Sequence, residues 1–504
     1  MVKLYSLGLF LAQASYASAI VSDNELALSH GQCLVGGSGC KNACHLLTRE
    51  FGRAVHYPRD DTHWVIWDEK QRQTRPACRV TPSSADQVAK IIKIVTSHWC
   101  RFAVKGGGHA QFVDASNSDG GVTIDLVGMK RLDVSRSRRT AHIGPGLVLA
   151  EVYTALEKRG LSFIGGRVAD VGVAGYSLGG GFSSLTPKYG LQVDNVLEYQ
   201  VVLPNATIVT ARHDKNPDLY FALRGGGNNF GIVTDFQIKL YRQGKILSGV
   251  KTYNDRYTGD IVRHVHQFST TLSNDTDMCF YSRYQYNQTT DRFQPSMWPI
   301  YSRPVADPAI FHDLNTIPYE SSTLRVDWQS NFTYEALDPP GSRNYFATLS
   351  FDPSEQLQLR ILDIFRQEVK RVNRSTRGFN TGIVTQALHR NAIKAMRLRG
   401  GNALGVSAKG PLNIVLLTVA WSQAEDDRAM HDFATRWHQR STAAAKDAGL
   451  WNRWLYINYC LDNQDPFAGY GEENRRRLRR IQSEIDPKGI FTSKGLCRGS
   501  FKVR

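Results

Sequence analysis

The chain has 504 residues and a formal net charge of +16. Its length is enough for two domains with substantial hydrophobic cores. The basic charge does not by itself predict nucleic-acid binding, because the lysines and arginines are dispersed and no nucleic-acid-binding motif accompanies them. Beyond the N-terminal segment no apolar run approaches about 18 residues, so we expect no insertion into a membrane.

The first residues predict export from the cell. A lysine at position 3 precedes a largely apolar run over residues 4–14, and the small residues 17–19 follow it. This is the pattern of a secretory signal peptide, which we assign to residues 1–19. We therefore expect a secreted protein, N-glycosylated at some of five sequons, at Asn205, Asn274, Asn287, Asn331 and Asn373.

Eight cysteines, an even number in a chain with an export signal, favour disulfides over metal ligands. Zinc is the alternative for the Cys40-x-x-x-Cys44 spacing, but no further Cys or His pair completes a site, and we expect no bound metal. The spacings alone leave the pairing open. The cysteines are Cys33, Cys40, Cys44, Cys78 and Cys100 in the first fifth, and Cys279, Cys460 and Cys497.

Residues 20–72 form a polar N-terminal segment with one predicted helix at 41–51. Residues 73–243 follow an α+β pattern that begins with a βαβ unit. We predict strands at 77–80, 101–104, 121–126, 142–144 and 231–241, a hairpin of strands 197–203 and 207–211, and helices at 85–98, 147–159 and 218–224.

Residues 244–450 are rich in aromatic residues, with predicted strands at 280–287, 324–332 and 414–421 and helices at 357–372 and 426–448. This pattern suits a sheet backed by helices. In the last segment, residues 451–504, the basic run at 475–480 overlaps Leu478, Ile481 and Ile485 at helical spacing. We interpret the arginines as the solvated face of a helix.

Three glycine clusters, at residues 106–108, 172–181 and 225–227, suggest one extended ligand held by the main chain. Glycines let successive N–H groups close on an anion such as a diphosphate. His109, directly after the first cluster, could act as a base, a metal ligand or a nucleophile toward a cofactor, or could be a hydrogen-bonded turn histidine.

The order of four motifs resembles a known family: Gly106-Gly107-Gly108-His109, the loop ending in residues 188–195, the segment 224–233, and Tyr456-Ile457-Asn458-Tyr459. They are similar to berberine-bridge-enzyme-like FAD-linked oxidoreductases of the vanillyl-alcohol-oxidase superfamily, of the fungal secreted type. The resemblance implies a PCMH-type FAD-binding domain of two α/β subdomains (73–243), a substrate domain with an antiparallel sheet backed by helices (244–450), and a C-terminal segment (451–504) that returns to the flavin.

The resemblance further implies FAD bonded covalently through His109 to the flavin 8α-methyl. Val168 stands where some relatives carry a second linking cysteine, so we expect a single link. The resemblance also favours a Cys44–Cys100 disulfide. Lys105 would neutralise phosphate or flavin, unless it is an exposed strand-end lysine. The other implied cofactor contacts are Gly106, Gly107, Gly108, Ala110, Val171, Gly172, Gly175, Ser177, Gly180, Gly181, Ile232 and Asn458.

By the same resemblance Tyr456 is the catalytic base and Tyr459 a further catalytic candidate, while Tyr176 would steer the substrate or stabilise the reduced flavin; packed aromatic residues are the alternative. We expect residues 456–459 to be a strand, which would put Tyr456 and Asn458 on one face and Tyr459 on the other. In the resembled family a small residue at the position of Val171 admits O2, which favours an oxidase over a dehydrogenase.

The resulting prediction is a secreted, monomeric FAD oxidase that takes a hydride from a small alcohol or amine, of the kind found in secondary metabolism, and releases hydrogen peroxide. One alternative is a sugar oxidase that yields a lactone, which the missing second link disfavours. Another is a flavin-holding protein or cyclase without oxidase turnover. A nicotinamide-dependent Rossmann enzyme is excluded, because no Gly-x-Gly-x-x-Gly opens a helix at the first turn. The substrate itself stays open.

Overall fold

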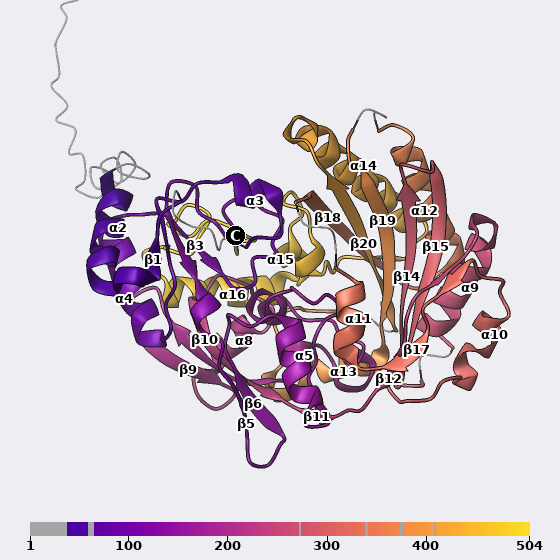
Figure 1. The fold of residues 1–504 in the computed structure, drawn as a ribbon, viewed down its shortest axis with the longest axis horizontal. Coiled ribbons are helices and arrows are strands. Elements are labelled where there is room, and N and C mark those ends of the chain that lie inside the picture. The colour runs from indigo at the N-terminus through magenta and orange to yellow at the C-terminus, as the bar shows by residue number, and fades with distance from the viewer. Residues whose placement is uncertain (1–37, 59–64, 272–273, 338–340, 373–375, 408–409) are drawn as a thin grey trace, which may run out of the picture.

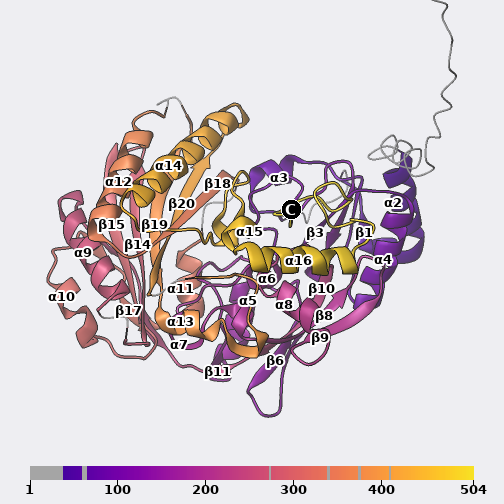
Figure 2. The same ribbon diagram turned by 180° about the vertical axis from the view of Figure 1, so that it is seen from behind.

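The computed structural model describes residues 38–58, 65–271, 274–337, 341–372, 376–407 and 410–504. The predicted signal peptide, Cys33 and Asn373 lie outside these ranges. Figures 1 and 2 show two halves side by side, one built around the sheets of the first 243 residues and the other around one large sheet. The C-terminal helices α15 (Pro466–Gly469) and α16 (Glu472–Ile485) run back from the second half across the first.

The first sheet has four strands in the order β1-β2-β4-β3: β1 (Val55–His56), β2 (Cys78–Val80), β4 (Val122–Asp125) and β3 (Phe102–Lys105). Strands β2 and β3 both pair with β4 in parallel, so the predicted βαβ unit exists with β4 between its strands. The apolar faces of α2 (Ser38–Phe51) and α4 (Ala85–Ser97) pack on this sheet.

Two disulfides join α2 to this sheet, and they correct the predicted pairing. Cys40 is bonded to Cys100, and Cys44 is bonded to Cys78. The two cysteines of α2 are one helical turn apart and therefore face the sheet together. The position of the helix over β2 and β3 then decides which partner each one meets. Cys279, Cys460 and Cys497 are buried free thiols.

The second sheet has five antiparallel strands in the order β5-β6-β10-β8-β9, and it contains the predicted hairpin of β8 and β9. Helices α5 and α8 and the short α6 and α7 accompany it. Their bounds are β5 Leu132–Val134, β6 Thr140–Ile143, α5 Leu149–Glu157, α6 Val173–Leu178, α7 Thr186–Tyr189, β8 Val196–Val202, β9 Ile208–Arg212, α8 Pro217–Leu223 and β10 Ile232–Lys239. The strands β7 (Leu161–Ser162) and β11 (Tyr241–Arg242) form a separate two-stranded antiparallel sheet in this half.

The large sheet is antiparallel, in the order β16-β13-β15-β14-β19-β20-β18-β21; off this path, β12 pairs with β15, and β17 pairs with β12. Helices α9, α12 and α14 cover one face of it (Figure 1), as the prediction of a helix-backed sheet requires. The bounds are β12 Ile246–Ser248, β13 Lys251–Thr252, α9 Thr258–Ser269, β14 Met278–Asn287, β15 Arg292–Tyr301, α10 His312–Asn315, β16 Ser321–Ser322, β17 Arg325–Asp327, α11 Gln329–Glu335, β18 Arg343–Phe351, α12 Glu355–Val369, β19 Asn380–Leu388, α13 Arg390–Ala395, β20 Leu412–Trp421, α14 Asp427–Asp447 and β21 Trp451–Asn452.

Side chains alternate along the central strands of this sheet. On β20, Val415, Leu417 and Val419 pack beneath the helices, whereas Leu416 and Thr418 face the other way and line a cavity between the two halves. The uncovered face of the sheet is therefore one wall of that cavity.

The predicted strand at 324–332 is only half correct, because β17 ends at Asp327 and α11 begins at Gln329. The carboxylate of Glu157 on α5 accepts hydrogen bonds from the main-chain N–H and the hydroxyl of Ser330, at 2.8 and 2.5 Å. An anion at the first turn favours a helix there, and this contact comes from a distant part of the chain.

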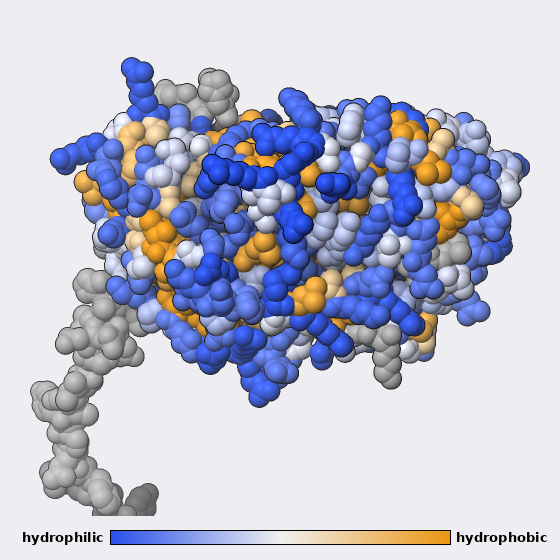
Figure 3. Space-filling view, turned by 90° about the horizontal axis from the view of Figure 1, so that it is seen from below, coloured by the Kyte–Doolittle hydropathy of each residue, from blue (hydrophilic) through white to orange (hydrophobic). Residues whose placement is uncertain are grey.

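The basic run at 475–480 lies on α16, as predicted, with Leu478 and Ile481 buried beneath it. Arg477 and Arg480 pair with Asp218 of α8. Figure 3 shows a mostly hydrophilic face on which apolar residues are scattered. None of the helices in the described ranges is both long and apolar enough to cross a membrane.

Candidate cofactor and active site

A cavity of about 340 Å³ lies between the two halves. Loop segments of the first half, the uncovered face of the large sheet and the C-terminal segment all contribute to its wall. The predicted site residues that line it are Gly106, Gly107, Gly108, His109, Ala110, Val168, Val171, Gly172, Gly175, Tyr176, Ile232, Tyr456, Asn458 and Tyr459. Four predicted site residues are not part of the wall: Lys105, Ser177, Gly180 and Gly181.

The first glycine loop presents main-chain donors to this cavity. Within the described ranges, the N–H groups of residues 107–110 donate to no acceptor of the protein. Gly108 has φ +78°, and a Cβ on Gly107 would lie 2.4 Å from the main-chain nitrogen of Gly172. Side chains are thus excluded where the two loops meet, and a row of free amides remains, which suits a phosphate or another anion.

His109 projects from the end of this loop into the cavity wall. Its ring stacks on Trp67, with the ring centroids 4.1 Å apart and the planes 12° from parallel. Its Nε2 lies 3.4 Å from Oδ1 of Asp170, which lies two residues before Gly172 in the loop that leads into the second glycine cluster. Burial alone would raise the pKa of Asp170, but the close contact with His109 outweighs it, so this pKa lies below its ordinary value. The imidazole is therefore held in one orientation from two sides.

Lys105 points away from the cavity. Its Nζ lies 3.2 Å from Oδ1 of Asp125, whose other oxygen accepts from Arg79. The Lys105 side chain is buried, so it is not the exposed strand-end lysine considered above. Strand alternation explains the placement, because Val104 of β3 faces the cavity and Lys105 faces the opposite side. The ammonium group stabilises the first sheet and is not placed to contact a ligand.

The glycines at 179–181 make room for aromatic side chains. A Cβ on Gly180 would lie 2.8 Å from the Tyr456 ring, one on Gly181 would lie 2.9 Å from the Tyr176 ring, and one on Gly179 would meet the Asn458 amide. We therefore do not assign Gly180 and Gly181 to the cofactor. Ser177, also predicted to bind the cofactor, is fully buried beneath the wall.

Residues 457–459 form a 3-10 helix, which corrects the predicted strand. Main-chain hydrogen bonds from Tyr459 to Tyr456 (2.8 Å) and from Cys460 to Ile457 (3.3 Å) close the turns. In a 3-10 helix residues i and i+3 share a face. Tyr456 and Tyr459 consequently lie together, with ring centroids 4.6 Å apart, instead of on opposite faces.

The hydroxyl of Tyr456 is already engaged. It accepts hydrogen bonds from the main-chain N–H groups of Gly181 (3.0 Å) and Phe182 (3.1 Å) and from the Asn458 amide (3.1 Å). Burial raises the pKa of Tyr456 well above its ordinary value, despite these donors. The geometry makes this phenol a structural link between the C-terminal segment and the second glycine cluster.

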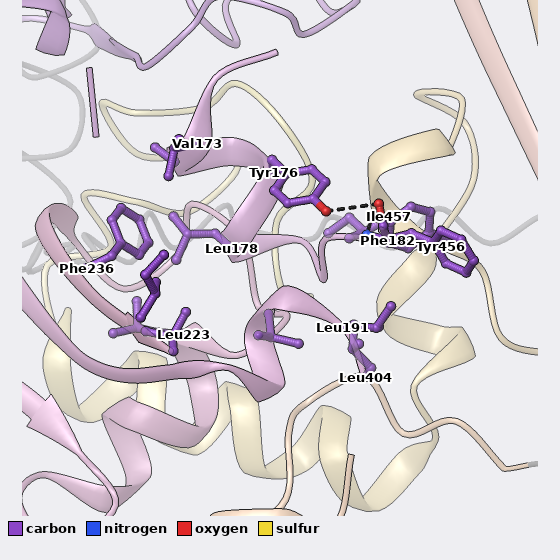
Figure 4. Close-up of a cluster of buried hydrophobic side chains, with 14 of the residues drawn as sticks. Val173, Tyr176, Leu178, Phe182, Leu191, Leu223, Phe236, Leu404, Tyr456 and Ile457 are labelled. Carbon is purple, nitrogen blue, oxygen red and sulfur yellow. Dashed lines mark hydrogen bonds between the residues drawn. The ribbon is translucent and has the colours of Figure 1, made fainter. Parts of the chain in front are cut away.

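Tyr176 is likewise fixed by the protein. Its hydroxyl donates to the carbonyl oxygens of Ile164 (3.0 Å) and Phe182 (2.9 Å), and burial raises its pKa. Figure 4 shows Tyr176, Phe182 and Tyr456 side by side within the buried hydrophobic cluster. The ring of Tyr176 contributes to the cavity wall, but its hydroxyl is turned into the protein.

Tyr459 differs from the other two tyrosines. It is only partly buried, and its OH lies 2.9 Å from Nη1 of Arg167, which also donates to Oε1 of Gln386 at 3.0 Å. Arg167 itself lines the cavity, and its guanidinium carbon lies 4.5 Å from the centroid of the Tyr281 ring. Sequence reasoning missed Arg167 and Gln386. The available signal was an arginine between the glycine pair at 165–166 and Val168.

The third glycine cluster and the residues after it form another part of the cavity wall. Asn229 holds its own loop, because its amide donates to the carbonyl oxygens of Gly226 (2.7 Å) and Phe501 (3.0 Å). Asn228 and Ile232 line the cavity.

The large sheet supplies the wall opposite the glycine loops: Arg283, Trp298, Phe346, Val384, Leu416 and Thr418. Within the described ranges, the buried indole N–H of Trp298 has no acceptor. No group of three or more His, Cys, Asp or Glu side chains among the described residues is arranged to hold a metal ion.

These residues fit FAD. The free amides of residues 107–110 match a diphosphate, His109 stands at the end of that loop, and aromatic and apolar side chains line much of the rest of the cavity. Its volume lies within the range usual for small-molecule sites.

Comparisons with known proteins agree with this reading. A family model described as an FAD binding domain matches residues 76–212. FAD-dependent monooxygenase tpcD of Cochliobolus heterostrophus is 31% identical over 525 aligned residues, covering 98% of each chain. The solved structure of wild-type BBE-like 1 from Physcomitrella patens has a TM-score of 0.74 at 19% identity, covering 92% of this chain and 99% of that one.

Xylooligosaccharide oxidase from Myceliophthora thermophila, solved with xylobiose, has a TM-score of 0.73 at 21% identity and covers 92% of this chain and 100% of its own. These structural likenesses confirm the predicted FAD-binding fold.

Proposed function

The chain belongs to the berberine-bridge-enzyme-like family of FAD-linked oxidoreductases, and on that premise we propose that it is a secreted oxidase of a small alcohol or amine. One observation carries the proposal: a single cavity brings His109 and its loop of free amides together with the Arg167–Tyr459 pair. The first group suits a cofactor, and the second suits proton transfer.

His109 would hold the cofactor by one covalent bond to the flavin 8α carbon, while residues 106–110 and 171–175 bind it through the main chain. The carboxylate of Asp170 would hold the imidazole in the reactive orientation, because it faces Nε2 and leaves Nδ1 available. Val168 offers no second bond. FAD bound there would accept two electrons as a hydride and deliver them to O2, giving hydrogen peroxide.

Tyr459 is the base in this proposal, in place of Tyr456. The guanidinium of Arg167 donates to its hydroxyl and holds the phenolic oxygen beside the cavity, where it can take the O–H or N–H proton of the substrate. Gln386 fixes the guanidinium from the other side. The Tyr456 hydroxyl, by contrast, is surrounded by protein donors.

Secretion and glycosylation stay part of the proposal. The N-terminal pattern supports a signal peptide, and the asparagines of the four sequons within the described ranges are exposed: Asn205, Asn274, Asn287 and Asn331. We expect the protein to be a monomer.

The proposed substrate is a largely apolar organic molecule, because Trp298, Phe346, Val384 and Leu416 form much of the sheet wall. The relative tpcD is called an FAD-dependent monooxygenase and the structural neighbour a xylooligosaccharide oxidase. The test is a peroxide-coupled screen of the purified protein against aromatic alcohols, amines and oligosaccharides, with anaerobic bleaching of the flavin as a second readout. Bleaching by an apolar alcohol or amine supports the proposal. Turnover of oligosaccharides alone would replace it with the sugar-oxidase alternative, and no bleaching by any of them would favour a flavin-holding protein.

A further inference from the structure

Arg167 is a largely buried cation without a carboxylate partner. Among the described residues no Asp or Glu oxygen lies within 4 Å of its guanidinium, which contacts the amide oxygen of Gln386, the hydroxyl of Tyr459 and the ring of Tyr281. All its nearest groups are neutral when both tyrosines are protonated.

Several other buried cations in the described part of the chain have carboxylate partners, and the two buried lysines without one, Lys251 and Lys502, differ from an arginine because burial lowers the pKa of each. Arg224 lies 3.1 Å from Asp194, Lys70 lies 2.8 Å from Asp68, and Lys105 shares Asp125 with Arg79. Removing a guanidinium from water is costly unless a counter-charge is present, and an arginine stays protonated even when it is buried. The missing counter-charge at Arg167 therefore calls for a partner that arrives from outside.

The cavity is where that partner would enter. Arg167 lines it, and only Nη1 of its three nitrogens makes a hydrogen bond to Gln386 and Tyr459. A guanidinium has five N–H donors in one plane, a geometry that matches two oxygens of a planar anion. The indole N–H of Trp298, buried in the same wall without an acceptor in the described ranges, is a further donor.

We propose that Arg167 binds an anionic oxygen of the substrate, so that the substrate is a planar organic anion, either a carboxylate or an ionised enol. This inference rests on the proposed function, whose substrate class it narrows. The anion would supply the missing counter-charge, and the apolar side chains of the sheet wall would hold the rest of the molecule. A neutral substrate would leave the cation uncompensated.

The test is calorimetric titration of the purified full-length protein with two matched probe pairs. Benzoate is compared with benzamide, and dimedone, an enol that is ionised at neutral pH, with its neutral enol methyl ether. We expect the anion of at least one pair to bind at least tenfold more tightly than its neutral partner. A preference for benzoate assigns a carboxylate, and a preference for dimedone assigns an enol. The absence of a preference in both pairs would overturn the proposal.

Variants locate the preference. R167Q should abolish it, and R167K should keep part of it, which guards against a folding defect in R167Q. R283Q removes the other arginine of the wall and should retain the preference. If R167Q still binds the anion more tightly than its neutral partner, the assignment to Arg167 is wrong. Loss of the preference in R283Q alone would assign the anion to Arg283 instead.

Y459F separates this proposal from the proposed function. If Arg167 served only to position the hydroxyl of Tyr459, the wild-type protein would show no anion preference. On our account Y459F retains the preference while flavin reduction is lost. Anion-selective binding by a protein whose flavin no candidate substrate reduces would leave this inference standing and reject the oxidase.

Discussion

The main chains of Gly107 and Gly172 pack directly against each other, so that a Cβ on Gly172 would lie 2.2 Å from the nitrogen of Gly107. This contact joins the loop that carries His109 to the loop that carries Asp170. Because the approaching atoms are main chain, no side-chain movement could make room for a methyl group.

The first prediction follows from that contact. Gly107→Ala should separate the two loops and leave the protein with little or no bound flavin. Gly259→Ala is the control, since this exposed glycine of α9 lies outside the cavity wall and a Cβ there has no atom within 4 Å. The measurement is the ratio of flavin to protein absorbance after purification, with the unfolding temperature recorded for both. Equal flavin content in the two variants would contradict the packing argument.

The second prediction concerns the base. Tyr459→Phe should lower the rate of anaerobic flavin reduction by about 100-fold or more, since general bases contribute about 10²–10⁴-fold. Tyr456→Phe should act mainly on stability, because it leaves the N–H groups of Gly181 and Phe182 without their acceptor, at a cost of roughly 1–3 kcal/mol. Stopped-flow reduction and thermal unfolding separate the two. A large rate loss in Tyr456→Phe at unchanged stability would reverse our assignment.

The third prediction concerns attachment of the cofactor. Asp170→Asn should slow covalent bonding about tenfold, because the carboxylate that orients His109 is lost. The measurement is the fraction of flavin that stays with acid-precipitated protein during reconstitution with FAD. Asp133→Asn, an exposed carboxylate on β5, is the control. Attachment at the wild-type rate would show that Asp170 does not orient the ring.

The fourth prediction concerns stability and pH. The fully buried carboxylate of Glu368 on α12 meets Arg436 (2.9 Å) and Arg440 (2.7 Å) on α14, and Arg371 (3.2 Å). Burial alone would raise the pKa of Glu368, but the arginines outweigh it and hold the pKa below its ordinary value of 4.5. As the pH falls, Glu368 is therefore protonated in the unfolded chain before it is protonated in the folded protein. Its contribution to the free energy of unfolding is complete above pH 4.5 and is lost as the pH falls through the lower pKa of the folded protein.

Glu368→Gln should accordingly destabilise the protein by about 2 kcal/mol at pH 7 and by less in acid. Thermal unfolding of both proteins at neutral pH and below pH 4 checks this. If the difference in stability between wild type and Glu368→Gln grew on acidification, the pKa of Glu368 would not be lowered by folding.

Regular elements with clear periodicity could be predicted from the sequence, and α4 and α14 lie within two residues of the predicted bounds. Strand β15 escaped notice because Pro295 and Pro299 interrupt its pattern, although it is paired along its whole length. The segment 456–459 was misassigned because the same residues satisfy an alternating pattern, while local main-chain bonds make a 3-10 helix.

The glycine loop and His109 could be found in the sequence because they are contiguous. The Arg167–Tyr459 contact could not, because its members are 292 positions apart and only the meeting of the two halves brings them together. The same applies to Gln386, which comes from the middle of the large sheet.

The most direct test of the account is a mass measurement of the proteolytic peptide that contains His109, from protein denatured in acid. We predict a mass increase equal to FAD less two hydrogens, localised to the His109 ring and absent in His109→Ala. An unmodified His109 peptide from yellow protein, with all the flavin released into the acid supernatant, would contradict the covalent link on which the proposed oxidase rests.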